Sequence, residues 1–178
     1  MYEEVISFWF TETSPAQWWS AKPEFDALIA RRFGELHRAA CKAELFAWRK
    51  EPKGRLAEVI VLDQFPRNMH RNSPLAFASD PLALALAQEA VVAGADTALD
   101  QAGRMFLYLP FVHSESRVIQ AEAERLVRAN GHKESLDSAL RHREIIDRFG
   151  RYPHRNEVLG RESTAEEIAF LRQPGSRF

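Results

Sequence analysis

The chain has 178 residues, of which 46% are hydrophobic and 11% aromatic, so it suits one domain with a substantial core rather than a disordered chain. Lysine and arginine number 24 against 25 aspartate and glutamate, and the net charge of −1 gives no overall attraction to nucleic acid. The single cysteine excludes an intrachain disulfide, and we find neither a signal peptide nor an 18-residue apolar run, so we expect a cytoplasmic protein with no membrane span.

Apolar residues at helical spacing predict helices from the N-terminus onward. The first covers about 2–10, and the second covers about 23–42 with Pro23 in its first turn. The segment 56–65 has β-branched character that would also suit a buried strand. Because nothing nearby supplies partner strands, we expect a buried helix that ends near Pro66.

The second half of the chain continues the same pattern, with Gly and Pro at the expected helix boundaries. Five more helices are expected: 81–93, started by Asp80-Pro81 and stopped by Gly94; 99–109, interrupted by Pro110; about 115–130; 133–149; and 165–172, started by a capping box at Thr164 to Glu167.

Helical periodicity without alternating strands predicts an all-α fold. We expect a single helical domain over 1–178, with about seven to nine helices whose antiparallel pairs stack as a tetratricopeptide-like array. The helix starts are too irregular for a strict 34-residue repeat. Residues 172–178 are expected to form a frayed tail.

The segment 148–156 (RFGRYPHRN) concentrates polar side chains where a helix must end. Gly150 can take the left-handed conformation, and Pro153 lacks the N–H of a continuing helix, so the chain turns here. Guanidinium groups suit carboxylate or phosphate oxygens. The turn is therefore a candidate anion site, or else its arginines simply stabilise the helix end. Its candidate residues are Arg148, Arg151, His154, Arg155 and Asn156.

A second segment, 62–68, again combines an aromatic residue, a proline, an arginine and an asparagine. Its candidate ligand-binding or catalytic residues are Asp63, Gln64, Arg67 and Asn68. Asp63 and Arg67 are four residues apart and would also suit an ordinary ion pair along one helix. Our hypothesis is that Asp63 faces Arg148 or Arg155 across a pocket.

A third segment, 108–115, places His113 and Glu115 after Pro110, at the expected start of a helix. A histidine there can act as an acid or base near neutral pH, although a lone histidine is more often a packed, hydrogen-bonded residue. The sequence has no glycine-rich phosphate loop, nucleophile elbow, zinc motif or paired cysteines. We therefore expect no metal and no cofactor.

The segments LDQFPRN (62–68), YLPFVHSE (108–115) and RFGRYPHRN (148–156), followed by LGRESTAEE (159–167), together resemble a bacterial family of uncharacterised helical proteins, domain of unknown function 924. The resemblance spans most of the chain. It implies a fold similar to tetratricopeptide-type helical arrays and brings no established activity. The positions that match its motifs are Asp63, Gln64, Arg67, Asn68, His113, Glu115, Arg148, Arg151, His154, Arg155 and Asn156.

Three functions fit these residues. The first is a binding module whose arginine-rich polar pocket takes a small anionic ligand or an acidic peptide. The second is a hydrolase or transferase in which His113 or His154 is the acid or base, Asp63 orients it, and arginines stabilise developing negative charge. The third is a protein–protein scaffolding module. Nucleic-acid and membrane partners are not expected, and the sequence leaves the ligand and the oligomeric state open.

Overall fold

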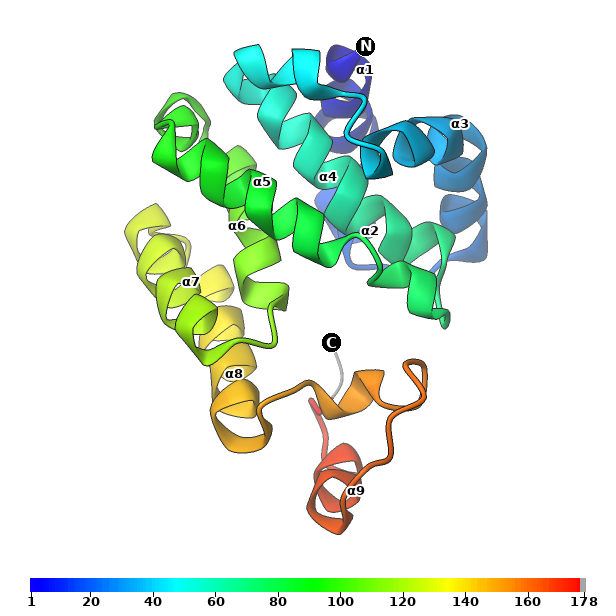
Figure 1. Ribbon diagram of the computed structural model, residues 1–178, viewed down its shortest axis with the longest axis vertical. Helices are drawn as coiled ribbons and strands as arrows, with labels where there is room; N and C mark the ends of the chain where they lie inside the picture. The colour runs from blue at the N-terminus through cyan, green and yellow to red at the C-terminus, as the bar shows by residue number, and fades with distance from the viewer. Residues whose placement is uncertain (177–178) are drawn as a thin grey trace.

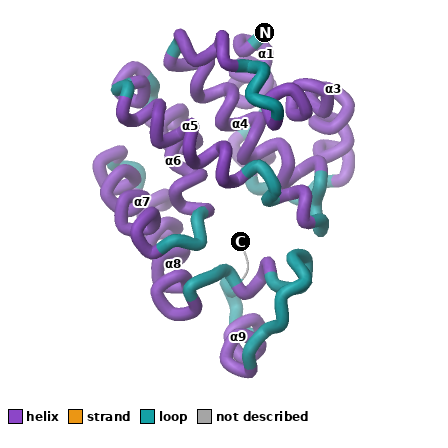
Figure 2. The backbone as a smooth tube through the Cα atoms, in the orientation of Figure 1, coloured by secondary structure: helices purple, strands orange, loops and turns teal. Residues whose placement is uncertain are grey.

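The computed structural model describes residues 1–176, and every regular element in them is helical (Figures 1 and 2). The α-helices of the described chain are α1 (Tyr2–Ser7), α2 (Pro15–Trp18), α3 (Pro23–Cys41), α4 (Pro52–Met69), α5 (Asp80–Val92), α6 (Gln101–His113), α7 (Arg117–Asn130), α8 (Lys133–Phe149) and α9 (Ala165–Leu171). A π-helical turn, η1 (Phe8–Glu12), extends α1, and four 3₁₀ turns lie between the α-helices: η2 (Phe46–Lys50), η3 (Pro74–Ala76), η4 (Ala95–Ala98) and η5 (Pro153–Arg155). The predicted all-α class is confirmed.

Helix α4 is the centre of the fold, because α1, α3, α5 and α6 all pack against it. It is buried on most of its surface, and its buried residues run from Gly54 to Asn68 with few interruptions. Beyond α6 the chain adds α7 and α8, each packed on the helix before it (Figure 1). The tetratricopeptide-like arrangement of these neighbours stays a prediction.

The predicted end of α4 near Pro66 is wrong, because the helix continues through the proline to Met69. Proline has no N–H to donate to the carbonyl oxygen of Leu62, one turn earlier. The hydroxyl of Ser79 donates to that oxygen instead, at 2.6 Å. The buried carbonyl is thereby satisfied, and the helix does not need to stop.

Helix α6 likewise continues through Pro110 instead of being interrupted there. His113 is consequently the last residue of α6 and not the start of the following helix. Glu115 lies in the short connection to α7, whose N-cap is Ser116. Both prolines therefore lie inside helices, each three residues from a candidate site residue.

The stretch Pro74–Val92, which spans η3 and α5, has the length and composition of a membrane span. Its mean hydropathy over 18 residues is 1.4, and 28% of those residues are buried. This corrects the expectation that no such run exists. Length and composition alone are weak evidence for a span, since core helices of soluble proteins have the same properties. In this fold α5 packs against α4 and α6.

After α8 the chain forms a separate C-terminal segment, residues 150–176, which Figures 1 and 2 show apart from the main body of helices. A small second core, Ile145, Ile146 and Tyr152 with Phe149 and Phe170, holds it to α8. The predicted capping box of α9 is confirmed at Thr164 and Glu167. Within the expected frayed tail, the hydroxyl of Ser176 is buried and donates to Leu171, while residues 177–178 lie outside the described part of the chain.

Candidate functional site

A cleft of about 360 Å³ opens where η3 and the start of α5, the end of α6, and the C-terminal segment meet. The 12 residues that line it are more often apolar than polar: Pro74, Phe77, Ala78, Pro81, Leu84, Pro110 and Leu159 against Asp80, His113, Ser114, Glu115 and Arg155. Three of the residues expected from the sequence motifs, His113, Glu115 and Arg155, are among these five polar residues, which we call the polar wall. A cleft with an apolar surface and a few convergent polar groups is typical of a small-molecule site.

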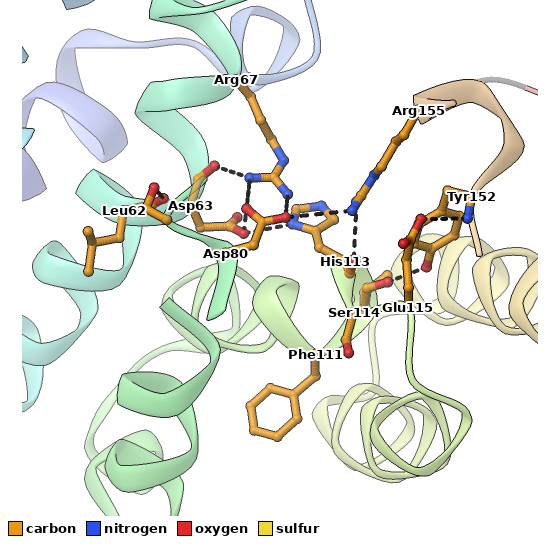
Figure 3. A network of polar contacts seen from close by, with 12 residues as sticks. Leu62, Asp63, Arg67, Asp80, Phe111, His113, Ser114, Glu115, Tyr152 and Arg155 are labelled. Atoms are coloured by element: carbon orange, nitrogen blue, oxygen red, sulfur yellow. Dashed lines mark hydrogen bonds and ion pairs between the residues drawn. The ribbon is translucent and has the colours of Figure 1, made fainter. Parts of the chain in front are cut away.

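His113 of α6 is held in the polar wall by Asp63 of α4, which is buried behind the lining of the cleft (Figure 3). The Nδ1 of His113 lies 2.8 Å from Oδ1 of Asp63. The carboxylate of Asp63 is fully buried, whereas the imidazole is 15% exposed and lines the cleft. Because a carboxylate only accepts, Nδ1 carries the proton and Nε2 keeps its lone pair. In the described chain, no hydrogen bond to Nε2 is found.

Arg67, one turn beyond Asp63 in α4, connects this pair to α5. Its guanidinium donates to both carboxylate oxygens of Asp80, at 2.9 Å each, and lies 3.3 Å from Oδ1 of Asp63. The bidentate geometry is the strongest arrangement of this ion pair. The ion pair of Asp63 with Arg67 therefore exists, and Arg67 shares its charge between two carboxylates.

These neighbours set the protonation of the pair. Burial alone would raise the pKa of Asp63, but Arg67 and His113 hold that pKa well below its usual range. Burial lowers the pKa of His113, and the charge of Arg67 lowers it further, while Asp63 opposes both effects. At neutral pH the site therefore contains an ionised Asp63 beside a neutral imidazole.

Arg155 reaches the same wall from the C-terminal segment (Figure 3). It is only 7% exposed, and its guanidinium lies 4.6 Å from the ring centres of both Phe77 and Tyr152. One nitrogen donates to the main-chain oxygen of His113 at 3.1 Å, and another lies 3.6 Å from Asp80. Its Nε is buried and has no hydrogen-bond partner among the described residues. Burial and the charge of Arg67 lower the pKa of Arg155.

Glu115, the other carboxylate of the wall, fastens the C-terminal segment to the end of α6. Its Oε2 and Oε1 accept from Arg161 at 2.7 and 2.9 Å, and Oε1 also accepts from the N–H of Tyr152 at 2.7 Å. The hydroxyl of Tyr152 donates to the carbonyl of Val112, at 2.5 Å. These bonds fix the last turn of α6, and with it the backbone of His113. Burial would raise the pKa of Glu115, but Arg161 and the N–H of Tyr152 lower it.

The hypothesis was that Asp63 faces Arg148 or Arg155 across a pocket. Arg155 does reach the cleft, but its ion-pair partner there is Asp80 and not Asp63, and the other arginines of the predicted cluster do not line the cleft. Arg148 is half-exposed and pairs with Glu166 of α9. Arg151 makes a bidentate pair with Glu167, which together with the Thr164 N–H holds the pKa of Glu167 down at about 2. Both arginines thus hold α9 to the segment before it.

The remaining predicted residues support the wall or lie beside it. Gln64 donates to Asp63, at 2.5 Å, and Asn68 donates to the main chain of Gln64. Asn156 is buried and contacts Ser163 within the C-terminal segment. His154 packs its ring 5.6 Å from that of Tyr152 and does not line the cleft.

Three residues of this site were not among the candidates taken from the sequence: Asp80, Arg161 and Phe77. Asp80 was interpreted only as a helix start, yet Ser79 occupies the N-cap position and the Asp80 carboxylate binds Arg67. Arg161 lies in the segment LGRESTAEE (159–167), which follows the three motif segments and carries the resemblance with them. Nothing in the local sequence of Phe77 indicates that two guanidinium groups lie over its ring.

Among residues 1–176, no group of three His, Cys, Asp or Glu side chains is placed to hold a metal ion. The chemistry that the wall offers comes from its own side chains: an oriented neutral imidazole, a buried guanidinium and an apolar surface.

Comparison with known proteins places these residues in a family without assigned function. Residues 5–175 match the family described as "Bacterial protein of unknown function (DUF924)". A solved structure, that of the protein of unknown function ATU0120 from Agrobacterium tumefaciens, is similar over 96% of each chain, with 39% sequence identity and a TM-score of 0.92. A search of curated proteins found no match.

Proposed function

The chain belongs to this bacterial family of unknown function, DUF924. From the geometry of its cleft we propose that it is an enzyme of hydrolase or transferase type that uses His113 as its acid or base. The observation that carries the proposal is the 2.8 Å contact of His113 Nδ1 with the buried Asp63. A buried carboxylate on one ring nitrogen fixes the tautomer and ring orientation, and this leaves the other nitrogen for a reactant.

The pKa of His113 fits the role of a base. Burial and Arg67 keep the imidazole neutral at pH 7, so Nε2 can accept a proton from water or from a substrate hydroxyl. The resulting imidazolium would be stabilised by Asp63, and Nε2 would later return the proton to the leaving group. Arg155 lines the same cleft and donates to the main-chain oxygen of His113 at 3.1 Å, so its positive charge would act on a reactant bound there.

A binding module is the second candidate, and the observation that favours it is the unpaired Nε of the buried Arg155. A buried cation whose only counter-ion within 4 Å, Asp80 at 3.6 Å, is already paired with Arg67 is costly, so a ligand anion on this guanidinium would be stabilising. In this alternative His113 orients the ligand by a hydrogen bond and transfers no proton. The two candidates share the cleft and differ in turnover.

The test is a panel of activated acyl esters, thioesters and phosphate esters, assayed with the wild-type protein and with His113→Asn. Asparagine can keep a hydrogen bond to Asp63 but has no second nitrogen for proton transfer. We expect kcat for any substrate turned over to fall about 10²- to 10⁴-fold, the usual contribution of a general acid or base.

The matched control is His132→Asn, because His132 is a partly exposed N-cap of α8 and asparagine is also a good N-cap. This variant should retain wild-type turnover. Equal turnover by His113→Asn, with an unchanged circular dichroism spectrum, would rule out the acid–base role. Ligand binding without turnover of any substrate in the panel would favour the binding module.

A further inference from the structure

The charges around the cleft are paired closely except at Arg155. Asp80 already has both oxygens on Arg67, and Glu115 has both oxygens on Arg161. Arg155 is left with an ion-pair distance of 3.6 Å to the occupied Asp80. Its charge is thus the least compensated in the wall.

The guanidinium of Arg155 has little freedom to find another partner inside the protein. The rings of Phe77 and Tyr152 lie over it at 4.6 Å each, and the hydrogen bond to the His113 carbonyl fixes one edge. Its Nε is buried without an acceptor in the part of the chain described. Such a guanidinium, preorganised and lining a cleft, is suited to one planar oxygen pair from a ligand.

The charge sum limits how negative that ligand can be. The buried cluster holds three carboxylates, on Asp63, Asp80 and Glu115, and three guanidinium groups, on Arg67, Arg155 and Arg161, so it is neutral while His113 is uncharged. One added negative charge would lie closest to Arg155, whose own ion pair with Asp80, at 3.6 Å, is the longest in the cluster. A second negative charge would face Asp80 and Glu115 at close range, which is unfavourable in a partly buried site.

The rest of the lining favours a ligand with an apolar body. Phe77, Pro81, Leu84, Pro110 and Leu159 are among the seven apolar residues of the twelve that line the 360 Å³ cleft. A ligand that covers this lining with carbon atoms gains the hydrophobic free energy of the surface removed from water.

We propose that the ligand of this cleft is a small monocarboxylate with an apolar body, its carboxylate on Arg155 and its apolar part on Leu84 and the neighbouring prolines. This names the substrate class of the proposed enzyme and so rests on that proposed function. It places the reacting bond a few atoms from the carboxylate, because the side chains of Arg155 and His113 line the same cleft and Arg155 donates to the main-chain oxygen of His113.

The probes for this proposal differ in one property each: hexanoate, acetate with the same charge but no apolar body, hexanol with no charge, and hexyl phosphate with a second charge. Binding is measured by isothermal titration and by the imidazole resonances of His113. We expect hexanoate to bind at least about tenfold more tightly than each of the other three. Hexanoate should also raise the pKa of His113, since a nearby anion favours the charged imidazole.

The variants separate the two halves of the ligand. Arg155→Gln should weaken hexanoate about 10- to 100-fold, the range for losing a charge-assisted hydrogen bond. Leu84→Gln should weaken hexanoate and leave acetate unchanged, and it keeps the proposal testable if Arg155→Gln does not fold. Arg148→Gln is the matched control, because Arg148 pairs with Glu166 away from the cleft.

The proposal is overturned if hexyl phosphate or hexanol binds as tightly as hexanoate, if no probe binds at millimolar concentration, or if a folded Arg155→Gln binds hexanoate normally. These outcomes are distinct from failure of the enzyme. Arg155-dependent binding without ester turnover would remove the catalytic function and keep the ligand class. Turnover of esters that lack a carboxylate, dependent on His113 and with KM unaffected by Arg155→Gln, would keep the catalytic function and remove the ligand class.

Discussion

Replacing Asp63 by asparagine is the sharpest perturbation of this protein, because it changes one buried charge and almost no volume. The carboxylate is fully buried and has three neighbours: His113 at 2.8 Å, Gln64 at 2.5 Å and Arg67 at 3.3 Å. All three present donors to it. An amide offers only one acceptor oxygen, so at least one of these donors would then face the amide NH₂.

Breaking a buried ion pair from one side costs about 3–5 kcal/mol. Arg67 keeps its bidentate contact with Asp80 in the variant, so we expect the low end of that range, about 3 kcal/mol. With a urea m-value of about 2 kcal/mol/M, the unfolding midpoint should fall by roughly 1.5 M.

The pH dependence gives a second readout. The pKa of Asp63 in the folded protein lies below its ordinary value of 3.8, so the native state binds its proton less readily than the unfolded chain. Its stabilising contribution is therefore complete well above that ordinary value and is lost as the pH falls below it. The difference between wild type and Asp63→Asn should accordingly shrink between pH 7 and strongly acidic solution.

Urea titrations followed by circular dichroism, at pH 7 and in strongly acidic solution, measure the change in the unfolding midpoint. The control is Glu35→Gln, because Glu35 pairs with Arg38 on the exposed face of α3. The control should have the wild-type midpoint. A midpoint change in Asp63→Asn below about 0.5 M, or one that persists unchanged in acid, would refute the assignment of Asp63 as the buried counter-ion of this network.

Four further substitutions, one of them a control, test the packing of the fold. A Cβ at Gly54 would collide with the main chain ahead of α4, so Gly54→Ala should lower the free energy of unfolding by about 1–3 kcal/mol, whereas Gly34→Ala, with open space in mid-α3, should raise it by about 0.5–1 kcal/mol in the same urea assay. Ser79→Ala removes the donor to the Leu62 carbonyl and should cost about 1–3 kcal/mol by urea unfolding. Burial lowers the pKa of His142 from its ordinary value of 6.5 to about 3. The contribution of the neutral imidazole to the stability of the fold is therefore complete above pH 6.5 and falls as the pH drops towards 3. His142→Leu should flatten the dependence of Tm on pH between these two values.

The helices themselves were largely readable from the sequence, since they depend on local spacing. The expected helices at 23–42 and 133–149 are found as Pro23–Cys41 and Lys133–Phe149, and the capping box of α9 is present. The two errors occur at Pro66 and Pro110. A rule based on the missing N–H assumes that the freed carbonyl has no other donor, and the hydroxyl that serves Leu62 comes from residue 79.

The site was readable only in part, because its charges are assigned by contacts between distant segments. Arg148, Arg151 and Arg155 look alike within one turn of sequence. Their partners lie 18, 16 and about 75 residues away: Glu166, Glu167 and Asp80. Local sequence cannot decide which arginine meets an acidic side chain of α9 and which enters the cleft.

The proline in α4 connects these two lessons. Because Pro66 cannot donate to Leu62, a buried carbonyl is left for Ser79, and the bond of 2.6 Å fixes the first turn of α5 against α4. The next residue, Asp80, is thereby held where Arg67 can bind it with both nitrogens and where Arg155 approaches from the C-terminal segment. A residue that normally ends a helix here anchors the neighbouring helix instead, and the same anchor aligns the charges that set the protonation of Asp63 and His113.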